Sequence, residues 1–191
     1  MKYFLLVLYF FLLNSVRLFP QDNHMVIRTG AGYYMDTFTS DDGPIIWLEA
    51  GYKLKSDFII NGRFSISSID WRIREGTFKD YLTIQQRQMY DLVFSRPLRI
   101  KGKHFLEPGF GFKMKKEYLL KPDIYVANNN GSRIIYTSYS DVFWEIGFTI
   151  CIDYYFQLRN NFYLGMRIDS NLIWALGFEG LTISPLFGFR F

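Results

Sequence analysis

Three glutamates occupy the same place in a short pattern that the sequence uses three times. The pattern is apolar, Glu, any residue, Gly, aromatic, any residue, apolar, and it occurs at 48–54, 106–112 and 144–150. Its carboxylates are Glu49, Glu107 and Glu145. A carboxylate among apolar residues can act as an acid or base, bind a cation, or pair with a buried arginine. Which chemistry applies depends on the groups that face it.

Nucleophilic catalysis needs a nucleophile within hydrogen-bond reach of a base, and the chain offers little of this kind. Neither of its two histidines, His24 and His104, has a serine one or two positions away. Its one cysteine, Cys151, can form neither an internal disulfide nor a zinc cluster. The glutamates have arginines to match them, and pairing removes the poised pKa that acid–base catalysis requires. We therefore expect no enzymatic activity, no catalytic residue, no metal site and no cofactor.

Apolar and polar residues alternate with a period of two over most of the chain after residue 25, as expected for β-strands with one apolar face. In the third copy of the pattern, Trp144, Ile146 and Phe148 share one face, whereas Glu145 and Gly147 share the other. The same alternation predicts eight strands, at 26–37, 44–55, 58–69, 81–95, 104–117, 141–154, 162–173 and 181–191.

The predicted strands leave longer connections at one end than at the other. The longer connections are 38–43, 70–80, 118–140 and 174–180, and the shorter ones are 56–57, 96–103 and 155–161. Eight strands of about ten residues with this asymmetry are typical of a transmembrane β-barrel. Aromatic residues expected to form girdles at its two rims are Trp47, Tyr52, Trp71, Tyr81, Tyr90, Trp144, Tyr154, Tyr155, Tyr163 and Trp174.

Alternation alone does not say which face points inward. A soluble lipocalin-like barrel buries its apolar face, whereas a transmembrane barrel turns that face toward lipid. The polar face here is rich in glycine, which suits a narrow lumen that also holds long charged side chains. The apolar face is rich in large aromatics and includes Pro108 and Pro185. The expected fold class is therefore all-β, an eight-stranded antiparallel up-and-down transmembrane β-barrel.

In this register the lumen receives equal numbers of acidic and basic side chains. The carboxylates are Asp36, Glu49, Asp91, Glu107, Glu145, Asp153 and Asp169, and the cations are Arg28, Lys53, Arg63, Arg87, Lys113, Arg167 and Arg190. Isolated buried charges are costly, so we expect a plug of ion pairs centred on Glu49, Glu107 and Glu145 with Arg63, Arg87 and Arg167. The balance of signs argues against a charge-selective pore.

The two ends of the sequence indicate export and insertion into a membrane. Residues 3–13 form an apolar run after Lys2 with the length of a signal-peptide core, so 1–21 is predicted to be a signal peptide, with its cleavage site left open, and 25–191 the single barrel domain. The alternative is a membrane anchor or a hydrophobic first helix. At the other end, Phe187, Phe189 and Phe191 alternate up to a terminal aromatic.

That last strand resembles the closing strand of small eight-stranded bacterial outer-membrane β-barrels of the OmpA and OmpX type. In that family the strand is read by the barrel-assembly machinery. The resemblance implies a bacterial outer-membrane location, with the lipid bilayer and the assembly machinery as partners. The net charge of +4 is small and spread along the chain, so no nucleic-acid partner is expected.

The connection at 118–140 carries the strongest sign of a binding surface. Asn129, Asn130 and Gly131 form a hairpin turn signal between apolar residues, so the flanking strands are expected to continue beyond the membrane as a surface hairpin. Its strand edge can pair with an extracellular partner. We expect a structural or surface-interaction role. The alternatives are a narrow channel for ions or small hydrophobic solutes, and a soluble periplasmic lipocalin-like binder.

Overall fold

The computed structural model describes residues 24–37, 42–75, 78–127, 133–158, 161–174 and 177–191, with the backbone alone described at 69–84 and 120–140. No helix in these ranges is long and apolar enough to cross a membrane. The described segments form nine strands. They are β1 (Met25–Asp36), β2 (Asp42–Lys53), β3 (Ile59–Glu75), β4 (Phe78–Ser95), β5 (Leu98–Lys101), β6 (His104–Ala127), β7 (Arg133–Gln157), β8 (Phe162–Ile173) and β9 (Gly177–Arg190).

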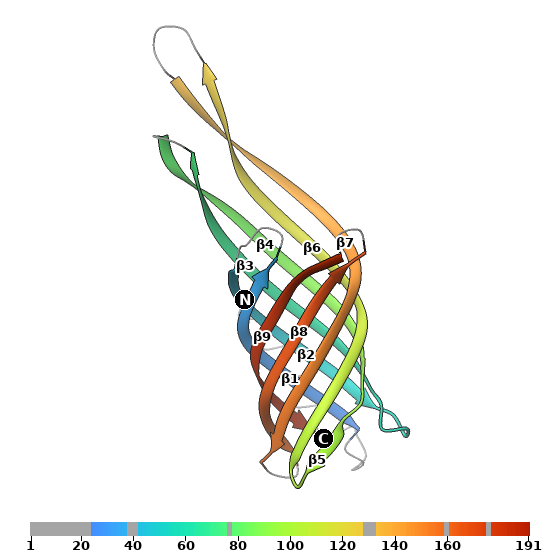
Figure 1. Ribbon diagram of the computed structural model, residues 1–191. Coiled ribbons are helices and arrows are strands. Elements are labelled where there is room, and N and C mark those ends of the chain that lie inside the picture. Colours follow the sequence, from blue (N-terminus) through green and yellow to red (C-terminus); the bar gives the residue numbers. More distant parts are fainter. Residues whose placement is uncertain (1–23, 38–41, 76–77, 128–132, 159–160, 175–176) are drawn as a thin grey trace, which may run out of the picture.

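The strands close into a barrel (Figure 1). Each long strand pairs antiparallel with its neighbours in sequence, and β1 pairs with β9 to close the ring. β5 has four residues and pairs only with the first residues of β6, whose next part, from Gly109 to Leu120, pairs with β4. The wall therefore consists of eight strands, and the predicted eight-stranded antiparallel up-and-down barrel is confirmed. β5 is an additional strand inside the predicted 96–103 connection.

The prediction that residues 70–80 form a connection between strands is wrong. β3 and β4 continue through it, and their pairing runs from Ile59↔Ser95 to Glu75↔Phe78. The sequence alternates poorly there because this part of the hairpin extends beyond the wall, where neither face has to be apolar. Backbone hydrogen bonds hold the hairpin together without that pattern.

Two hairpins extend past the barrel at the same end (Figure 1). β6 and β7 pair continuously from His104↔Phe156 to Ala127↔Arg133. β4 and β6 pair only as far as Ile84↔Leu120, beyond which the β3–β4 and β6–β7 hairpins are separate. The predicted turn residues Asn129, Asn130 and Gly131 lie outside the described residues. We call this end of the barrel the long-hairpin end, and the opposite end the short-turn end.

The wall carries its apolar side chains on the outside. In β2, the buried side chains alternate with exposed ones, so that Ile46 is 59% and Leu48 51% exposed whereas Glu49 is 1% exposed. The same holds around the barrel, where Phe112, Ile150 and Phe187 face outward and Arg28, Arg63 and Arg167 are buried. This is the register predicted for a transmembrane barrel, because large apolar side chains are turned toward the surroundings and charged ones away from them.

The predicted aromatic girdles need a correction. Tyr52, Tyr90, Trp144, Tyr154 and Trp174 are exposed on the outside as expected, and the side chains of Trp71 and Tyr81 lie outside the described set. Trp47, Tyr155 and Tyr163 instead point inward and are at most 4% exposed. Strand alternation puts these three on the polar face, where their ring polar atoms find partners; Trp47 Nε1, for example, donates to Ser184 Oγ at 2.9 Å. They pack with Val26, Ile59 and Leu186 in a buried apolar cluster.

Inward glycines let neighbouring strands lie where a side chain would collide. A Cβ atom on Gly111 would lie 2.3 Å from the carbonyl oxygen of Leu92 and 2.8 Å from Val93 Cα. Backbone atoms cannot swing aside, so we expect Gly111→Ala to lower the free energy of unfolding by about 1–3 kcal/mol. Urea unfolding in phospholipid vesicles measures the loss.

The matched control for this prediction is Gly62→Ala on the outward face. A Cβ atom on Gly62 meets only the Ala50 carbonyl oxygen, at 4.0 Å. Its effect should stay within about 0.5 kcal/mol, the usual range for a surface substitution. Equal effects of the two alanines would contradict the close approach described at Gly111.

Candidate functional site

The short-turn half of the lumen is filled by five charged side chains, each at most 1% exposed. We call this set the basal cluster, and its members are Arg28, Glu49, Glu107, Asp153 and Arg167. Arg28 comes from β1 and contacts three carboxylates on three other strands. The distances from its Nη atoms are 3.0 Å to Glu49 Oε1, 2.7 Å to Glu107 Oε2 and 3.4 Å to Asp153 Oδ2.

Arg167 joins two of the same carboxylates from β8. Its Nη1 and Nη2 donate to the two oxygens of Glu49 at 2.8 and 3.1 Å, and its Nε and Nη2 donate to the two oxygens of Asp153 at 2.6 Å. Its guanidinium also lies 4.2 Å from the centroid of Trp47. Paired N–H donors facing both oxygens of a carboxylate give this fork both strength and a fixed geometry.

Hydroxyl groups complete the hydrogen bonding of the basal cluster. Glu107 Oε1 accepts from Ser95 Oγ at 2.6 Å, and its Oε2 accepts from Tyr155 Oη at 3.1 Å. Arg28 Nε donates to Tyr163 Oη at 2.8 Å. Every guanidinium nitrogen and carboxylate oxygen of the cluster therefore has a partner, which is the condition under which buried charges are tolerated.

A second layer of charges, the middle cluster, lies next along the lumen. Its members are Arg63, Asp91, Lys113, Thr149 and Asp169. Arg63 Nε lies 2.9 Å from Asp91 Oδ2, and its Nη1 lies 2.5 Å from Asp169 Oδ2. Lys113 Nζ lies 3.0 Å from Asp91 Oδ1, and Arg63 Nη2 donates to Thr149 Oγ1 at 3.2 Å. With two cations and two carboxylates, this layer is formally neutral.

The third layer lies at the long-hairpin end, and its centre is Lys115. The ammonium group of Lys115 lies 2.8 Å from Glu117 Oε2 and 2.5 Å from Glu145 Oε2, and it also contacts Glu179. Beside it, Arg87 Nη2 donates to Asp36 Oδ2 at 2.5 Å. We call this layer the mouth cluster, and its charged members are Asp36, Arg87, Lys115, Glu117, Glu145 and Glu179.

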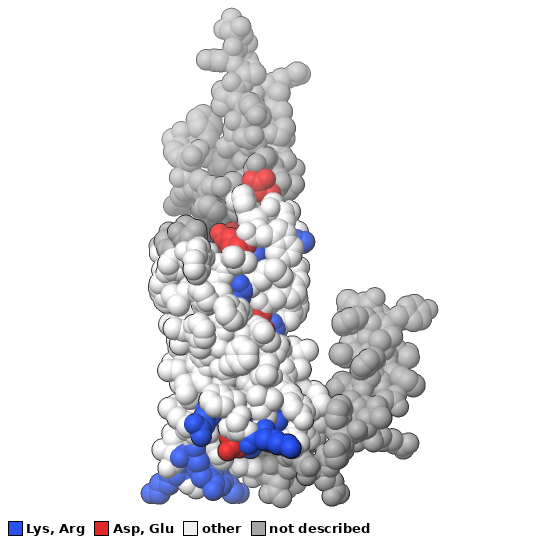
Figure 2. Space-filling view, turned by 90° about the vertical axis from the view of Figure 1, so that its right-hand side faces the viewer, with Lys and Arg blue, Asp and Glu red and all other residues white. Residues whose placement is uncertain are grey.

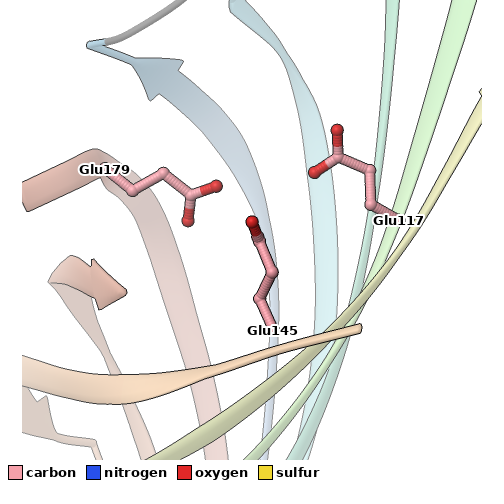
Figure 3. Close-up of side chains that lie close together, drawn as sticks. All are labelled: Glu117, Glu145 and Glu179. Atoms are coloured by element: carbon pink, nitrogen blue, oxygen red, sulfur yellow. The ribbon is translucent and has the colours of Figure 1, made fainter. Parts of the chain in front are cut away.

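Three glutamates of the mouth cluster are close enough together to resemble a metal site. One oxygen each of Glu117, Glu145 and Glu179 lies within 4.8 Å of the others, and the three side chains converge on one point (Figure 3). The ammonium of Lys115 contacts all three carboxylates. An internal cation thus already neutralises these oxygens in part, so we assign no metal to them.

Each of the six lumen residues predicted from the sequence belongs to one of the three clusters, but the six are divided among the clusters and do not form a single centre. Glu49, Glu107 and Arg167 belong to the basal cluster, Arg63 to the middle cluster, and Arg87 and Glu145 to the mouth cluster. Of the ion pairs described, only that of Glu49 with Arg167 joins two of the six. Each of the other four pairs with a residue outside the set.

Three charged residues of the mouth cluster were missed by the sequence reading: Lys115, Glu117 and Glu179. Lys115 and Glu117 continue the inward series Glu107, Gly109, Gly111 and Lys113 of β6, so strict alternation along the whole strand identifies them. Glu179 lies in the predicted connection 174–180, but β9 begins at Gly177 and includes it.

The phenylalanines of the closing strand lie on the outward face and at the last residue. Phe187 and Phe189 face outward and are 45% and 41% exposed. Phe191 forms two backbone hydrogen bonds with Met25, at 2.8 and 2.9 Å, where β1 begins. The strand therefore completes the ring at the short-turn end. Its reading by the assembly machinery stays a prediction.

Comparison with known proteins gives no match to a family model and no match among curated proteins. Solved structures do match. Neisserial surface protein A superposes with a TM-score of 0.59 at 11% identity, covering 89% of this chain and 98% of that one. The barrel has the fold of the small outer-membrane β-barrels. A major outer-membrane protein of Thermus thermophilus superposes with a TM-score of 0.57 at 11% identity, covering 87% and 99% of the two chains.

A third match is to Ail, the attachment invasion locus protein of Yersinia pestis, solved in complex with the heparin analogue sucrose octasulfate. Its TM-score is 0.54 at 13% identity, covering 88% of this chain and 98% of that one. At identities this low, the superpositions establish the fold alone. The activity has to be argued from the chain's own residues. Each superposition extends over nearly the whole of the matched chain, so the likeness is one of the entire barrel and not of a few strands.

Proposed function

We propose that this protein is a bacterial outer-membrane barrel that contacts partners at the cell surface through its two long hairpins, while its lumen serves as a closed structural plug. Longer hairpins lie outside the cell in such barrels, and short turns lie in the periplasm. The described start of β1 and the end of β9 then face the periplasm. Residues 1–21 act as the signal peptide, and the closing strand engages the assembly machinery.

The observation that carries this proposal is the pair of open strand edges on each hairpin. β6 pairs with β4 only up to Leu120, and β7 pairs with β8 only from Gly147. Between these points each strand has one described neighbour, the other strand of its own hairpin. Unpaired backbone N–H and C=O groups on such an edge can add a strand from a partner. The β3–β4 hairpin has the same form beyond Ser67, where pairing with β2 ends.

The lumen supports a surface role rather than transport. The basal cluster joins side chains from β1 to β8 across the barrel with every charged atom paired, and this favours a closed lumen over a conduit. An interior of eight strands is only wide enough for side chains. The match to an attachment protein solved in complex with a heparin analogue makes sulfated polysaccharide a second partner to test, beside protein chains that add a strand to the open edges.

Shortening the β6–β7 hairpin tests the proposal. Leu120 and Ser140 face each other across the hairpin, so residues 121–139 can be replaced by Asn-Gly, a two-residue turn that suits such a pair. We expect the full chain to increase retention of expressing cells on immobilised heparin or their settling in culture, and the shortened chain to lose most of that increase. Cell counts and optical density measure these effects.

A second variant shortens the other hairpin, with residues 69–85 replaced by Asn-Gly between Ser68 and Gln86, which also face each other, and it measures the share of the effect that this hairpin carries. Both variants must reach the outer membrane in equal amounts and keep a mobility that changes on boiling. If neither the full chain nor either variant changes retention or settling relative to cells without the protein, the surface-interaction role is wrong.

A further inference from the structure

The turns at the short-turn end carry a concentration of positive charge. Six cations lie within 53–58 and 96–104, and we call them the basic rim: Lys53, Lys55, Arg96, Arg99, Lys101 and Lys103. Five of them are exposed and Lys53 is partly exposed. Figure 2 shows Lys and Arg gathered at this end of the molecule, below a wall of uncharged residues.

The one acidic residue in these segments is already paired. Asp57 Oδ1 lies 2.7 Å from Lys53 Nζ. The hydrogen bond and charge of Lys53 lower the pKa of the Asp57 carboxyl below its usual value, so it is ionised at neutral pH. After this pair is counted, the basic rim keeps an excess of five positive charges.

The two segments of the basic rim are neighbours in space and not only similar in composition. The guanidinium of Arg96, just after β4, lies 5.4 Å from the ring centroid of Phe58, in the turn between β2 and β3. Arg99 lies 5.6 Å from the ring centroid of Phe105 on β6. The contact of Arg96 with Phe58 therefore joins the two segments, and cation–ring contacts hold both Arg96 and Arg99 at this end of the barrel.

Apolar side chains alternate with these cations and are exposed as well. All four residues of β5 are exposed, with Leu98 at 45% and Ile100 at 59%, and Phe58 is 42% exposed. β5 is hydrogen-bonded to β6 along one edge and buries neither of its faces. Exposed apolar residues among Lys and Arg, at the margin of a lipid-facing wall, are typical of a surface that lies in a membrane interface.

We propose that the basic rim and β5 form a binding site for anionic phospholipids of the leaflet at the short-turn end. Lys and Arg side chains contact the lipid phosphates, while Leu98, Ile100 and Phe58 enter the layer of glycerol and upper acyl chains. Charge complementarity favours this occupant, and so does position, because the outward Phe94 and Phe110, 41% and 49% exposed, continue the apolar surface into the wall. The site lies at the opposite end from the hairpins, so it does not depend on the surface-contact role.

The described outward residues at the long-hairpin end do not show the same excess of positive charge. The excess is therefore a feature of the basic rim and not of the whole wall. The described outward positions near the long-hairpin end include Lys116, whose ammonium lies 4.6 and 5.2 Å from the rings of Tyr118 and Trp144. Asp42 and Asp141 lie at the same end. Among the described outward residues the positive excess lies at the short-turn end, so we expect a preference for anionic lipid to depend on the basic rim.

The test uses the full barrel folded into nanodiscs that mix phosphatidylcholine with phosphatidylglycerol. Native mass spectrometry, after mild release from the disc, counts which lipids stay bound. We expect phosphatidylglycerol to be enriched at least about fivefold over its share of the disc, with the enrichment falling as salt screens the charges. The triple variant Arg96→Gln, Arg99→Gln, Lys101→Gln should lose most of it.

Two further variants keep the test decisive. Lys116→Gln, Lys121→Gln and Arg133→Gln together remove the same number of charges away from the basic rim, and this variant should keep the enrichment. Leu98→Ser with Ile100→Ser leaves every charge in place and should reduce the number of retained lipids.

Enrichment that is equal in the wild type and in the basic-rim variant overturns the proposal. So does the absence of any preference for phosphatidylglycerol, and retention of the barrel on purified cell-wall sacculi would then identify an anionic polymer as the partner. Mobility on gels before and after boiling confirms that each variant is folded, and the serine variant supplies a second comparison should the triple variant fold poorly.

Discussion

Replacing Arg167 by alanine should lower the free energy of unfolding by about 3–5 kcal/mol, the cost of leaving buried carboxylates without their cation. Arg167 supplies four of the hydrogen bonds that hold Glu49 and Asp153, and all three side chains are 1% exposed. Without it, one remaining arginine, Arg28, faces three carboxylates. Urea unfolding of the barrel in phospholipid vesicles, followed by the gel shift between folded and unfolded bands, measures the change.

Two controls separate the missing charge from the missing volume. In vesicles of phosphatidylcholine alone, which offer the basic rim no anionic lipid, Arg99→Ala removes the same side chain from an exposed position and should change the free energy of unfolding by no more than about 0.5 kcal/mol. Combining Arg167→Met with Glu49→Gln and Asp153→Asn removes the cation and two carboxylates together. This variant should recover part of the lost stability, because no buried charge is then left without a partner of opposite sign. A loss below about 1 kcal/mol in Arg167→Ala would show that the basal cluster does not fix the lumen.

The basal cluster was foreseeable in its composition but not in its connections. Period-two alternation placed Glu49, Glu107 and Arg167 inside the barrel, because every second side chain of a strand shares a face. It says nothing about which inward residues meet across the lumen. That depends on the relative shift of strands around the ring, which brings Arg28 of β1 to Glu107 of β6. Such a shift is set by hydrogen-bond register, and the composition of a single strand does not encode it.

The limits of the wall were harder to predict than the wall itself. The sequence pattern located β2 and β8 to within two residues at each end, since an apolar face is required throughout both strands. It ended β3 too early, because β3 continues into a projecting hairpin, where neither face has to be apolar. The continuation of β6 into its own hairpin was expected from the turn signal at 129–131, and the pairing of β6 with β7 confirms it. Trp47, at the middle of β2, shows that an aromatic residue of the wall need not face the lipid when its ring nitrogen has a partner in the lumen.

Placing an arginine on the outside of the wall should destabilise the barrel almost as much as removing one from its interior. Ile150 is 45% exposed on β7, between the outward aromatic residues Trp144 and Tyr154 of the same strand. If lipid surrounds it, Ile150→Arg puts a charge near the middle of the bilayer, and we expect a loss of about 2–4 kcal/mol in the free energy of unfolding. The same urea titration in vesicles provides the measurement.

Val142→Arg is the matched control, because Val142 is also a β-branched residue on the outward face of β7 and is 51% exposed. It lies beyond Trp144 toward the long-hairpin end, where the cost of a charge falls to about 0–1 kcal/mol. The difference between the two sites decides between the two kinds of barrel that alternation allows. A soluble barrel would have both positions in water and would tolerate both arginines equally, whereas a transmembrane barrel must discriminate between them by depth.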